Sequence, residues 1–517
     1  MELEHLHLKK IEQLQEQVRA IFMQRRGQES PETIALRYPS GHSNTTRSKS
    51  YKATSRQLDF GSLNQVIQID PQKRLAVVEP RVTMEALVKT TLPYGLIPYV
   101  VPEFKGITVG GAIMGGAAES SSHRWGTFND GCSAFMILCG DGSLLQASPQ
   151  ENPDLFYGIA GSYGSIGALV SATIELQPAK EFVHVRYRLF SNPQEAIGYL
   201  QTLSHGTPAP EFIDGIVFSK DLAVVIEGTL QTKENIAHLP RFSLQSVCSR
   251  WYYQHVQNIA LEAHLDRYEE AMPFQEYLFR YDQGAFWMGA YLLRPPLLAR
   301  FIGQGILKLW KAEEEQFSEE EIGKLHRITH PNAFWRFFLR PVMTSQRLWS
   351  LLHRAEKWVQ ERVIIQDFCI PEDKASSFLG EVLDDPGTYP MWLCPIKGTR
   401  SPQIFSPHLI SKRSMHKSAF NGENPLGEGL SEENPADGFI NIGIYGLPSY
   451  YASIEQITRK LEQKTKAYGG RKVLYSRSHY THEEFWQIYF REAYEALRAK
   501  TQAKGIWHEI TDKVLSV

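Results

Sequence analysis

The chain has 517 residues, of which 42% are hydrophobic and 22% are charged, and its formal net charge at pH 7 is −2. This length is large for one hydrophobic core, so we expect two or three domains. The near balance of charge argues against nucleic-acid binding, which usually requires a strong basic excess. The N-terminal segment lacks the apolar core of a signal peptide, and no apolar run approaches the roughly 20 residues of a membrane span. We therefore expect a cytoplasmic protein.

The first predicted element is an amphipathic helix at the N-terminus. Leu6, Ile11, Leu14 and Val18 recur at helical spacing with charged residues between them, a pattern typical of a helix packed on the domain that follows. A short polar loop comes next, over residues 37–52. Main-chain N–H groups in such a loop can form a nest for an anion.

Beyond this loop, short strands and helices alternate, which predicts the α+β class. After Pro178 the texture changes, and a second α+β region is expected. Strands are predicted at 63–69, 75–79, 171–177, 183–190, 212–218, 223–230, 363–370, 391–396, 439–445 and 473–475, with helices at 82–92, 193–204 and 451–468. Residues 245–360 are expected to be mostly helical, and the polar, Ser/Pro/Gly-rich residues 398–437 to form a mobile loop.

Glycines crowd the stretch from 101 to 170. Glycine is used where a backbone takes positive φ or lies close to something, so we expect a sheet whose main chain holds a large ligand such as a dinucleotide. The spacing is GGxxxG at 110–115 and GxxGxxG at 161–167. Neither matches the Rossmann GxGxxG or the Walker A pattern, so these glycines serve another binding geometry.

Several spaced motifs carry a family resemblance. GHSNTTR, VEP, ITVGG, ESSSHRWG, NPDLF and GSYGSIG follow in this order, which resembles the FAD domain of the vanillyl-alcohol-oxidase (PCMH-type) superfamily over roughly residues 30–178. VPEFKGITVGGAIMGG, QDFCIP, YPMWLCP, GFINIGIYG and YTHEEFWQIY are similar to the Delta(24)-sterol reductase (Diminuto-like) family, with a thinner match between about 235 and 330. The resemblance implies a two-subdomain FAD-binding domain, 1–178 with a C-terminal return at about 471–517, and an α+β cap domain with an antiparallel sheet, 179–470.

The resemblance also implies which residues hold FAD. Ser40, Gly41, His42, Ser43, Asn44, Thr45 and Thr46 would hold the pyrophosphate, and Thr108, Val109, Gly110 and Gly111 would close on it from the other side. Gly115, Gly116, Glu119, Ser120, Ser121 and Gly126 would follow the ribityl chain and isoalloxazine, and Gly164, Ser165, Gly167 and Val170 the adenosine half. Some superfamily members carry a covalent flavin bond on a Gly-His at this loop. We expect non-covalent FAD, with a link to His42 as the minority alternative.

Four side chains are candidates for catalysis. His123 follows three serines and either lies near the flavin or stabilises its turn. Gln366 and Asp367 interrupt an apolar strand, as a core hydrogen-bonding pair or as part of a substrate cavity. Tyr480 lies in the C-terminal segment and has a hydroxyl that can donate a proton. The histidines and carboxylates at 479–484 lack a third well-spaced ligand, so no metal site is expected.

The resemblance implies reduction of a C=C bond in a sterol-like or other apolar substrate, by hydride transfer from reduced flavin with NADPH as the reductant. Two alternatives stay open: an FAD-dependent oxidase or dehydrogenase of an alcohol or sugar-like substrate, and a non-catalytic flavin-fold protein at a membrane surface. The aromatic and Arg-rich stretches at 285–301 and 332–349 either contact a membrane surface peripherally or form a domain core. The oligomeric state stays open.

Overall fold

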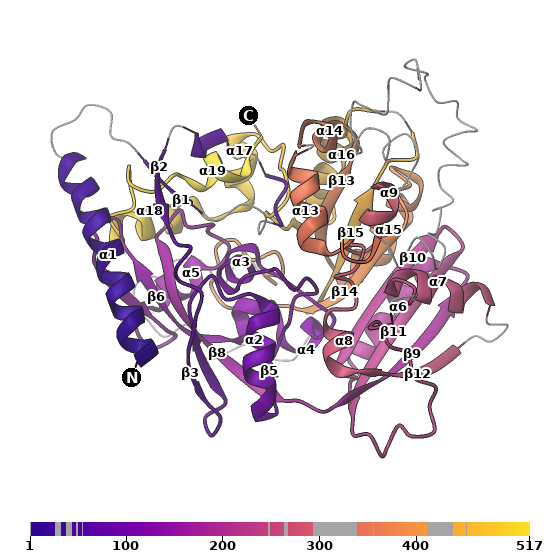
Figure 1. Cartoon of the computed structure of the whole chain (residues 1–517). Helices are drawn as coiled ribbons and strands as arrows, with labels where there is room; N and C mark the ends of the chain where they lie inside the picture. The colour runs from indigo at the N-terminus through magenta and orange to yellow at the C-terminus, as the bar shows by residue number, and fades with distance from the viewer. Residues whose placement is uncertain are drawn as a thin grey trace, which may run out of the picture.

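A computed structural model describes residues 2–25, 33–37, 44–47, 50–53, 55–246, 249–262, 267–292, 339–354, 356–410, 438–450 and 452–516. It combines helices with two large sheets whose strands pair antiparallel, which confirms the α+β class. Figure 1 shows one sheet beside the N-terminal helix and the other on the opposite side of the molecule. None of the described helices is long and apolar enough to cross a membrane.

The N-terminal helix α1 (Glu2–Arg25) lies along the outer edge of the molecule (Figure 1). Ile11, Leu14 and Val18 are buried as predicted, in a cluster shared with Leu138, Ala168, Val170 and residues 503–507. Leu6 was expected on the same buried face but is 44% exposed, because the cluster begins only further along the helix. A short parallel pair, β1 (Ile34–Arg37) and β2 (Arg56–Asp59), contributes to this cluster.

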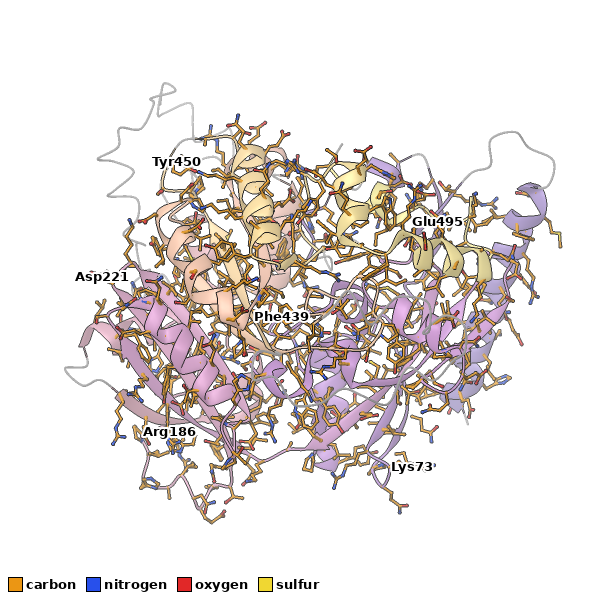
Figure 2. All side chains as sticks on the ribbon, turned by 180° about the vertical axis from the view of Figure 1, so that it is seen from behind. Lys73, Arg186, Asp221, Phe439, Tyr450 and Glu495 are labelled. Atoms are coloured by element: carbon orange, nitrogen blue, oxygen red, sulfur yellow. The ribbon has the colours of Figure 1, made fainter. Side chains whose placement is uncertain are left out.

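The first large sheet has the order β3-β4-β8-β6-β7, and β5 pairs with β8. Its strands are β3 (Val66–Asp70), β4 (Leu75–Val78), β5 (Leu96–Pro98), β6 (Cys132–Leu138), β7 (Leu144–Ala147) and β8 (Ala168–Pro178). Lys73 marks the turn of the β3–β4 hairpin at the edge of the molecule (Figure 2), which confirms the predicted strand pair. The connecting helices are η1 (Ser50–Lys52), α2 (Met84–Thr91), η2 (Leu92–Tyr94), α3 (Val109–Gly115), α4 (Ser122–Trp125), η3 (Phe128–Gly131) and α5 (Pro153–Ile159).

The second sheet has eight antiparallel strands in the order β12-β9-β11-β10-β14-β15-β13-β16. Their bounds are β9 (Phe182–Phe190), β10 (Phe212–Ser219), β11 (Leu222–Gln231), β12 (Arg267–Pro273), β13 (Ile364–Pro371), β14 (Met391–Lys397), β15 (Gly438–Gly446) and β16 (Arg471–Lys472). Two predictions were wrong. β12 lies in the segment expected to be helical, because pairing with β9 overrides its weak local preference. The strand expected at 473–475 is replaced by β16, two residues earlier.

Helices α6 (Pro193–Ser204), α15 (Glu372–Asp384) and α16 (Ile454–Ala467) cover one face of the second sheet. The other helices that the structure describes after β11 are α7 (Tyr252–Glu262), α8 (Phe274–Leu278), α9 (Met288–Leu292), α13 (Ser345–Arg354), α14 (Glu356–Arg362), α17 (His482–Ile488), α18 (Arg491–Lys500) and α19 (Ile510–Val514). The domain limit proposed at residue 178 falls between β8 and β9, at the passage from one sheet to the other. The domain division and the two FAD subdomains stay predictions. Residues 411–437 of the expected mobile loop lie outside the described residues.

A buried carboxylate fastens α1 to the first sheet. Glu79, which follows β4, accepts hydrogen bonds from His7 Nδ1 at 2.8 Å and from Lys10 Nζ at 3.0 Å. It also accepts one from the backbone N–H of Gln65 at 2.7 Å. Burial alone would raise the pKa of Glu79, but these partners together lower it below the ordinary value. The ionised form of Glu79 is therefore the one that this contact stabilises.

We expect Glu79→Gln to lower the free energy of unfolding at pH 7 by about 3 kcal/mol, because it leaves the largely buried Lys10 ammonium group without its charge partner. A lowered folded-state pKa stabilises above the unfolded pKa and loses its effect as pH falls through the folded value. The difference from wild type should therefore be full at pH 7 and shrink at pH 4 and below. Thermal denaturation at both pH values, with the exposed Glu16→Gln as control, measures this. Equal melting temperatures of Glu79→Gln and wild type at pH 7 would show that the contacts of the Glu79 carboxylate contribute nothing to stability.

Candidate functional site

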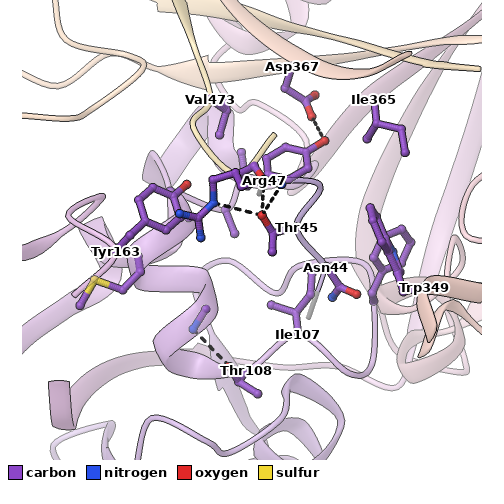
Figure 3. Close-up of a pocket in the computed structure, with 18 of the residues that line it drawn as sticks. Asn44, Thr45, Arg47, Ile107, Thr108, Tyr163, Trp349, Ile365, Asp367 and Val473 are labelled. Carbon is purple, nitrogen blue, oxygen red and sulfur yellow. Dashed lines mark hydrogen bonds between the residues drawn. The ribbon is translucent and has the colours of Figure 1, made fainter. Parts of the chain in front are cut away.

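A cavity of about 300 Å³ lies between the glycine-rich segment and the second sheet. This size is at the lower end of the range of small-molecule sites. Figure 3 shows residues from distant parts of the chain converging on it, among them Thr45, Thr108, Asp367 and Val473. Their convergence explains why no single stretch of sequence reveals the site.

The sheet wall of the cavity follows from the alternation of side chains along strands. In β13, Ile364, Phe368 and Ile370 pack under the covering helices. The alternate residues of the strand point the other way and line the cavity: Ile365, Asp367 and Cys369. The neighbouring strands add, in the same way, Trp392 and Ile396 from β14 and Asn441 and Tyr445 from β15. Ala285, Phe286 and Met288 extend this wall, so it is mainly apolar and aromatic.

The opposite wall is backbone-rich. Thr108 is the N-cap of α3, and its Oγ1 accepts a hydrogen bond from the backbone N–H of Gly111 at 3.2 Å. Gly110, Gly115 and Gly116 also line the cavity. Gly116 has a φ of +62°, which favours glycine, and a Cβ added to Gly115 would meet no atom within 4 Å. The space that a side chain would fill at Gly115 is therefore open to a ligand.

One end of the cavity is cationic. Lys513 Nζ donates to the carbonyl oxygens of Tyr163 and Gly164, both at 3.0 Å. The Arg47 guanidinium lies 3.8 Å from the centre of the Tyr163 ring, and its Nε donates to Thr45 Oγ1 at 3.0 Å (Figure 3). Burial, then the charge of Arg47 and other cations, holds the pKa of Lys513 well below its ordinary value. No described carboxylate forms an ion pair with Arg47 or Lys513, so this end suits an anion.

The other end carries carboxyl groups. Asp367 Oδ1 accepts hydrogen bonds from Asn441 Nδ2 at 2.6 Å and from the Tyr445 hydroxyl at 2.7 Å. Its Oδ2 accepts one from the Tyr475 hydroxyl at 2.6 Å. Burial raises the pKa of Asp367 although these donors oppose it. Burial, reinforced by Asp367, raises the pKa of both tyrosines well above 10.

Glu103 lines the same cavity, in the loop between β5 and α3. Burial raises the pKa of this carboxyl group to about 8, and the carboxylates of Glu119 and Asp367 add to the effect. Sequence reasoning missed Glu103, because the segment VPEFKGITVGG was examined for its glycines. The available signal was an acidic residue flanked by Val101, Pro102 and Phe104. A charged residue in an apolar segment is costly to bury, so it indicates a partner or a functional role.

The structure places only some of the proposed FAD residues at this cavity. Those that line it are Asn44, Thr45, Thr108, Gly110, Gly111, Gly115, Gly116 and Gly164. Ser40, Gly41, His42 and Ser43 lie outside the described residues. Thr46 lines a smaller neighbouring cavity together with Gln366. The lining does not include Val109, Glu119, Ser120, Ser121, Gly126, Ser165, Gly167 or Val170. The cofactor roles of all these residues stay proposals.

Several residues away from the lining have structural contacts of their own. Val170 packs in the cluster beneath α1, whereas its strand neighbour Leu169 faces the cavity. A Cβ on Gly167 would come within 2.6 Å of Ile137, so close sheet packing explains this glycine. The carboxylate of Glu119 forms a buried ion pair with Arg280 at 2.9 Å. The seryl groups from 120 to 122 are buried as well.

Three of the four catalytic candidates also lie away from the lining. His123 is buried, with its ring nitrogens 3.0 Å from the Ser120 carbonyl oxygen and 2.9 Å from that of Pro210. Burial lowers the pKa of His123 to about 4, against the effect of the two carbonyls. Tyr480 is buried in the core, where desolvation raises its pKa well above 10. Gln366 bonds to the Arg477 carbonyl at 3.2 Å and to Ser476 Oγ at 2.8 Å. His123 and Gln366 are therefore held by hydrogen bonds within the protein, and Tyr480 by burial in the core.

The residues at the cavity fit FAD. The backbone-rich wall admits close approach, and Arg47 and Lys513 provide charge for a diphosphate. The Tyr163 hydroxyl and Trp349 Nε1 are buried, line the cavity and have no hydrogen-bond partner among the described residues. Buried polar groups are normally bonded, so both are available to a polar ligand. The described residues include no group of three or more His, Cys, Asp or Glu side chains that could hold a metal ion.

Comparison with known proteins agrees with this geometry. A family model described as an FAD binding domain matches residues 30–148. The chain is 26% identical to the Delta(24)-sterol reductase of Homo sapiens over 98% of this chain and 86% of the relative. It is also 26% identical to that of Arabidopsis thaliana, over 88% of this chain and 75% of the relative. A decaprenylphosphoryl-beta-D-ribose oxidase of Mycolicibacterium smegmatis is 32% identical, but over only 24% of this chain and 27% of the oxidase.

The full-length similarity and the matching FAD domain point to the same superfamily as the spaced motifs. The chain therefore belongs to the FAD-linked oxidoreductases of the vanillyl-alcohol-oxidase (PCMH-type) superfamily and is homologous to the Delta(24)-sterol reductases over nearly its whole length.

Proposed function

We propose that this protein reduces a C=C bond of a sterol-like or other apolar substrate, with FAD as cofactor and NADPH as reductant. The observation that carries the proposal is a cavity with two unlike walls. One wall is backbone-rich and cationic at one end, and the other is apolar and aromatic. The similarity to Delta(24)-sterol reductases extends to the strands that form the second wall, whereas the similarity to the oxidase covers about a quarter of the chain. This difference favours the reductase over the alcohol oxidase.

Arg47 and Lys513, with the backbone from Thr108 to Gly116, are the groups that would hold FAD. When bound and reduced by NADPH, the flavin would supply two electrons to the substrate as a hydride equivalent. Two hydrogen bonds keep Arg47 in place. Its Nε donates to Thr45 Oγ1, and its Nη1 donates to the carbonyl oxygen of Lys513 at 3.1 Å. A preformed cationic site of this kind loses little free energy to reorganisation when an anion binds.

The apolar wall suits a fused-ring or isoprenoid substrate. Phe286 packs against Trp392 and Tyr445, with ring centres 5.5 and 5.4 Å apart. Trp287 Nε1 donates to the Tyr445 carbonyl at 2.7 Å and fixes this aromatic group from behind. Each Å² of apolar surface removed from water contributes about 25 cal/mol. Burial of the substrate here would therefore supply binding free energy and exclude water from the reacting bond.

Lys513→Met should weaken FAD binding, because it removes an amine whose protonated form a diphosphate at the cationic end would stabilise. Loss of one charge-assisted hydrogen bond costs about 1.5–3 kcal/mol, so Kd should rise roughly 10- to 150-fold. Titration of the apoprotein with FAD, followed by fluorescence, measures the change. Lys89→Met, on the exposed surface of α2, removes an equal charge and should leave Kd unaltered. An unaltered Kd in Lys513→Met with a normal melting temperature would contradict the assignment of the cationic end.

FAD should be bound without a covalent link. After precipitation of the purified holoprotein with acid, we expect a yellow supernatant and a colourless pellet, because a non-covalent cofactor is released when the fold is lost. His42→Ala should keep its flavin during purification. A yellow pellet that becomes colourless in His42→Ala would instead show that His42 carries the flavin.

The reaction itself can be tested in two half-reactions without oxygen. NADPH should bleach the flavin absorbance of the holoprotein, and a sterol with a Δ24 double bond should restore it, giving a product two mass units heavier. The same sterol with a saturated side chain is the matched control and should restore nothing. Peroxide formation with an alcohol substrate in air, without reoxidation by any alkene, would contradict the reductase and favour the oxidase.

A further inference from the structure

One carboxyl group that lines the cavity is not used to stabilise the fold. The Glu103 carboxyl accepts a hydrogen bond from its own backbone N–H, and no other residue in the described part of the chain bonds to it. We propose that Glu103 is the catalytic acid that protonates the second alkene carbon during reduction. This inference rests on the proposed function and adds the residue that completes its chemistry.

Two hydrogen bonds at Lys105, two residues after Glu103, hold this part of the loop in place. The backbone N–H of Lys105 donates to Asp282 Oδ1 at 3.0 Å, and that of Glu85 donates to the Lys105 carbonyl at 3.2 Å. The neighbouring Phe104 ring packs edge-on against Phe286, with centres 5.7 Å apart. Glu103 therefore lies beside the aromatic wall that we assign to the substrate, on a backbone with little freedom to move it away.

The other acidic groups at this end are already engaged. Asp367 accepts three hydrogen bonds, and Tyr445 and Tyr475 direct their O–H groups at it. A hydroxyl that donates to a carboxylate is not available to donate to an alkene. Cys369 Sγ donates to Asn441 Oδ1 at 3.5 Å. Among the described acidic groups at this end, Glu103 is thus the one whose proton is not donated to another protein group.

Burial keeps Glu103 protonated at neutral pH. The charged groups that face it come from several elements. Glu119, which precedes α4, and Asp367 on β13 favour the neutral form, and Arg280, which follows α8, favours the ionised form. The Arg280 charge is largely taken up by Glu119 at 2.9 Å and by Asp214 at 3.1 Å. Burial outweighs Arg280, and the pKa of Glu103 rises to about 8. A pKa near the working pH is the optimum for a general acid.

The atoms and electrons of the step balance. The alkene loses its π bond and gains two C–H bonds, one from a hydride that brings both electrons and one from a proton. The hydride comes from the FAD that NADPH has reduced. The O–H bond of Glu103 breaks as the second C–H bond forms, and the carboxylate left behind takes up a proton from water before the next turnover. Because an isolated alkene accepts hydride poorly, this protonation must precede or accompany hydride transfer.

Stopped-flow measurement of the two half-reactions on the holoprotein tests the proposal. In Glu103→Gln, reduction of the flavin by NADPH should stay within threefold of wild type. Its reoxidation by the Δ24 sterol should fall roughly 10²- to 10⁴-fold, the usual contribution of a general acid. The wild-type reoxidation rate should fall as pH rises above about 8, and the residual rate of the variant should not. Glu85→Gln, which removes an exposed carboxylate beside the same loop, should behave as wild type.

A second measurement does not depend on turnover. A raised folded-state pKa means that the unfolded chain loses its Glu103 proton first, so stability falls with pH between the ordinary value near 4.5 and about 8. The melting temperature of Glu103→Gln should therefore rise relative to wild type across this interval and then level off. Glu103→Asp, which keeps a carboxyl group, should retain part of the reoxidation rate that Glu103→Gln loses.

The outcomes separate the two proposals. Reoxidation of Glu103→Gln at a rate within threefold of wild type would overturn the role of Glu103 and leave the proposed function standing. Failure of the wild type to be reoxidised by any alkene would overturn both. A melting-temperature difference that does not vary with pH would overturn the protonated state from which the role is argued.

Discussion

The alternation of side chains across the eight-stranded sheet is the constraint on which the site depends. One face is sealed by α6, α15 and α16, which bury Ile364, Phe368 and Ile370 of β13. The other face carries large apolar side chains that must also leave water. The glycine-rich wall lies across from this face and encloses the cavity with it. A cofactor and an apolar substrate bound in this cavity would therefore be held by the same burial that holds the two halves of the chain to one another.

Charge is distributed unevenly along this cavity. Arg47 and Lys513 gather at one end, whereas Glu103 and Asp367 occupy the other. Such an arrangement costs free energy in the absence of a ligand, because buried like charges repel one another and buried polar groups require partners. The same burial and repulsion between like charges shift the pKa values of the groups at this cavity, as they do at functional sites in general. An anionic cofactor at the cationic end would offset part of it.

Much of the fold and part of the site were predictable from sequence. The β3–β4 hairpin and helix α6 came from local patterns, and the glycine-rich segment came from its unusual spacing. β12 was missed because its pairing with β9, and not its own residues, makes it a strand. His123 and Tyr480 were plausible acids by residue type, but burial and backbone contacts engage them elsewhere. Asp367 was found because a carboxylate stood out in an apolar strand. Glu103 was signalled in the sequence only by its apolar neighbours. Tyr445 and Lys513 required the three-dimensional arrangement, because their roles depend on the residues that face them across the cavity.

A crystal structure of the yellow holoprotein with a bound Δ24 sterol tests the central claim most directly. We expect the FAD diphosphate at Arg47 and Lys513, and the sterol against Phe286 and Trp392 with its double bond beside Glu103. FAD or sterol bound in a different part of the molecule, with this cavity filled by water alone, would contradict it.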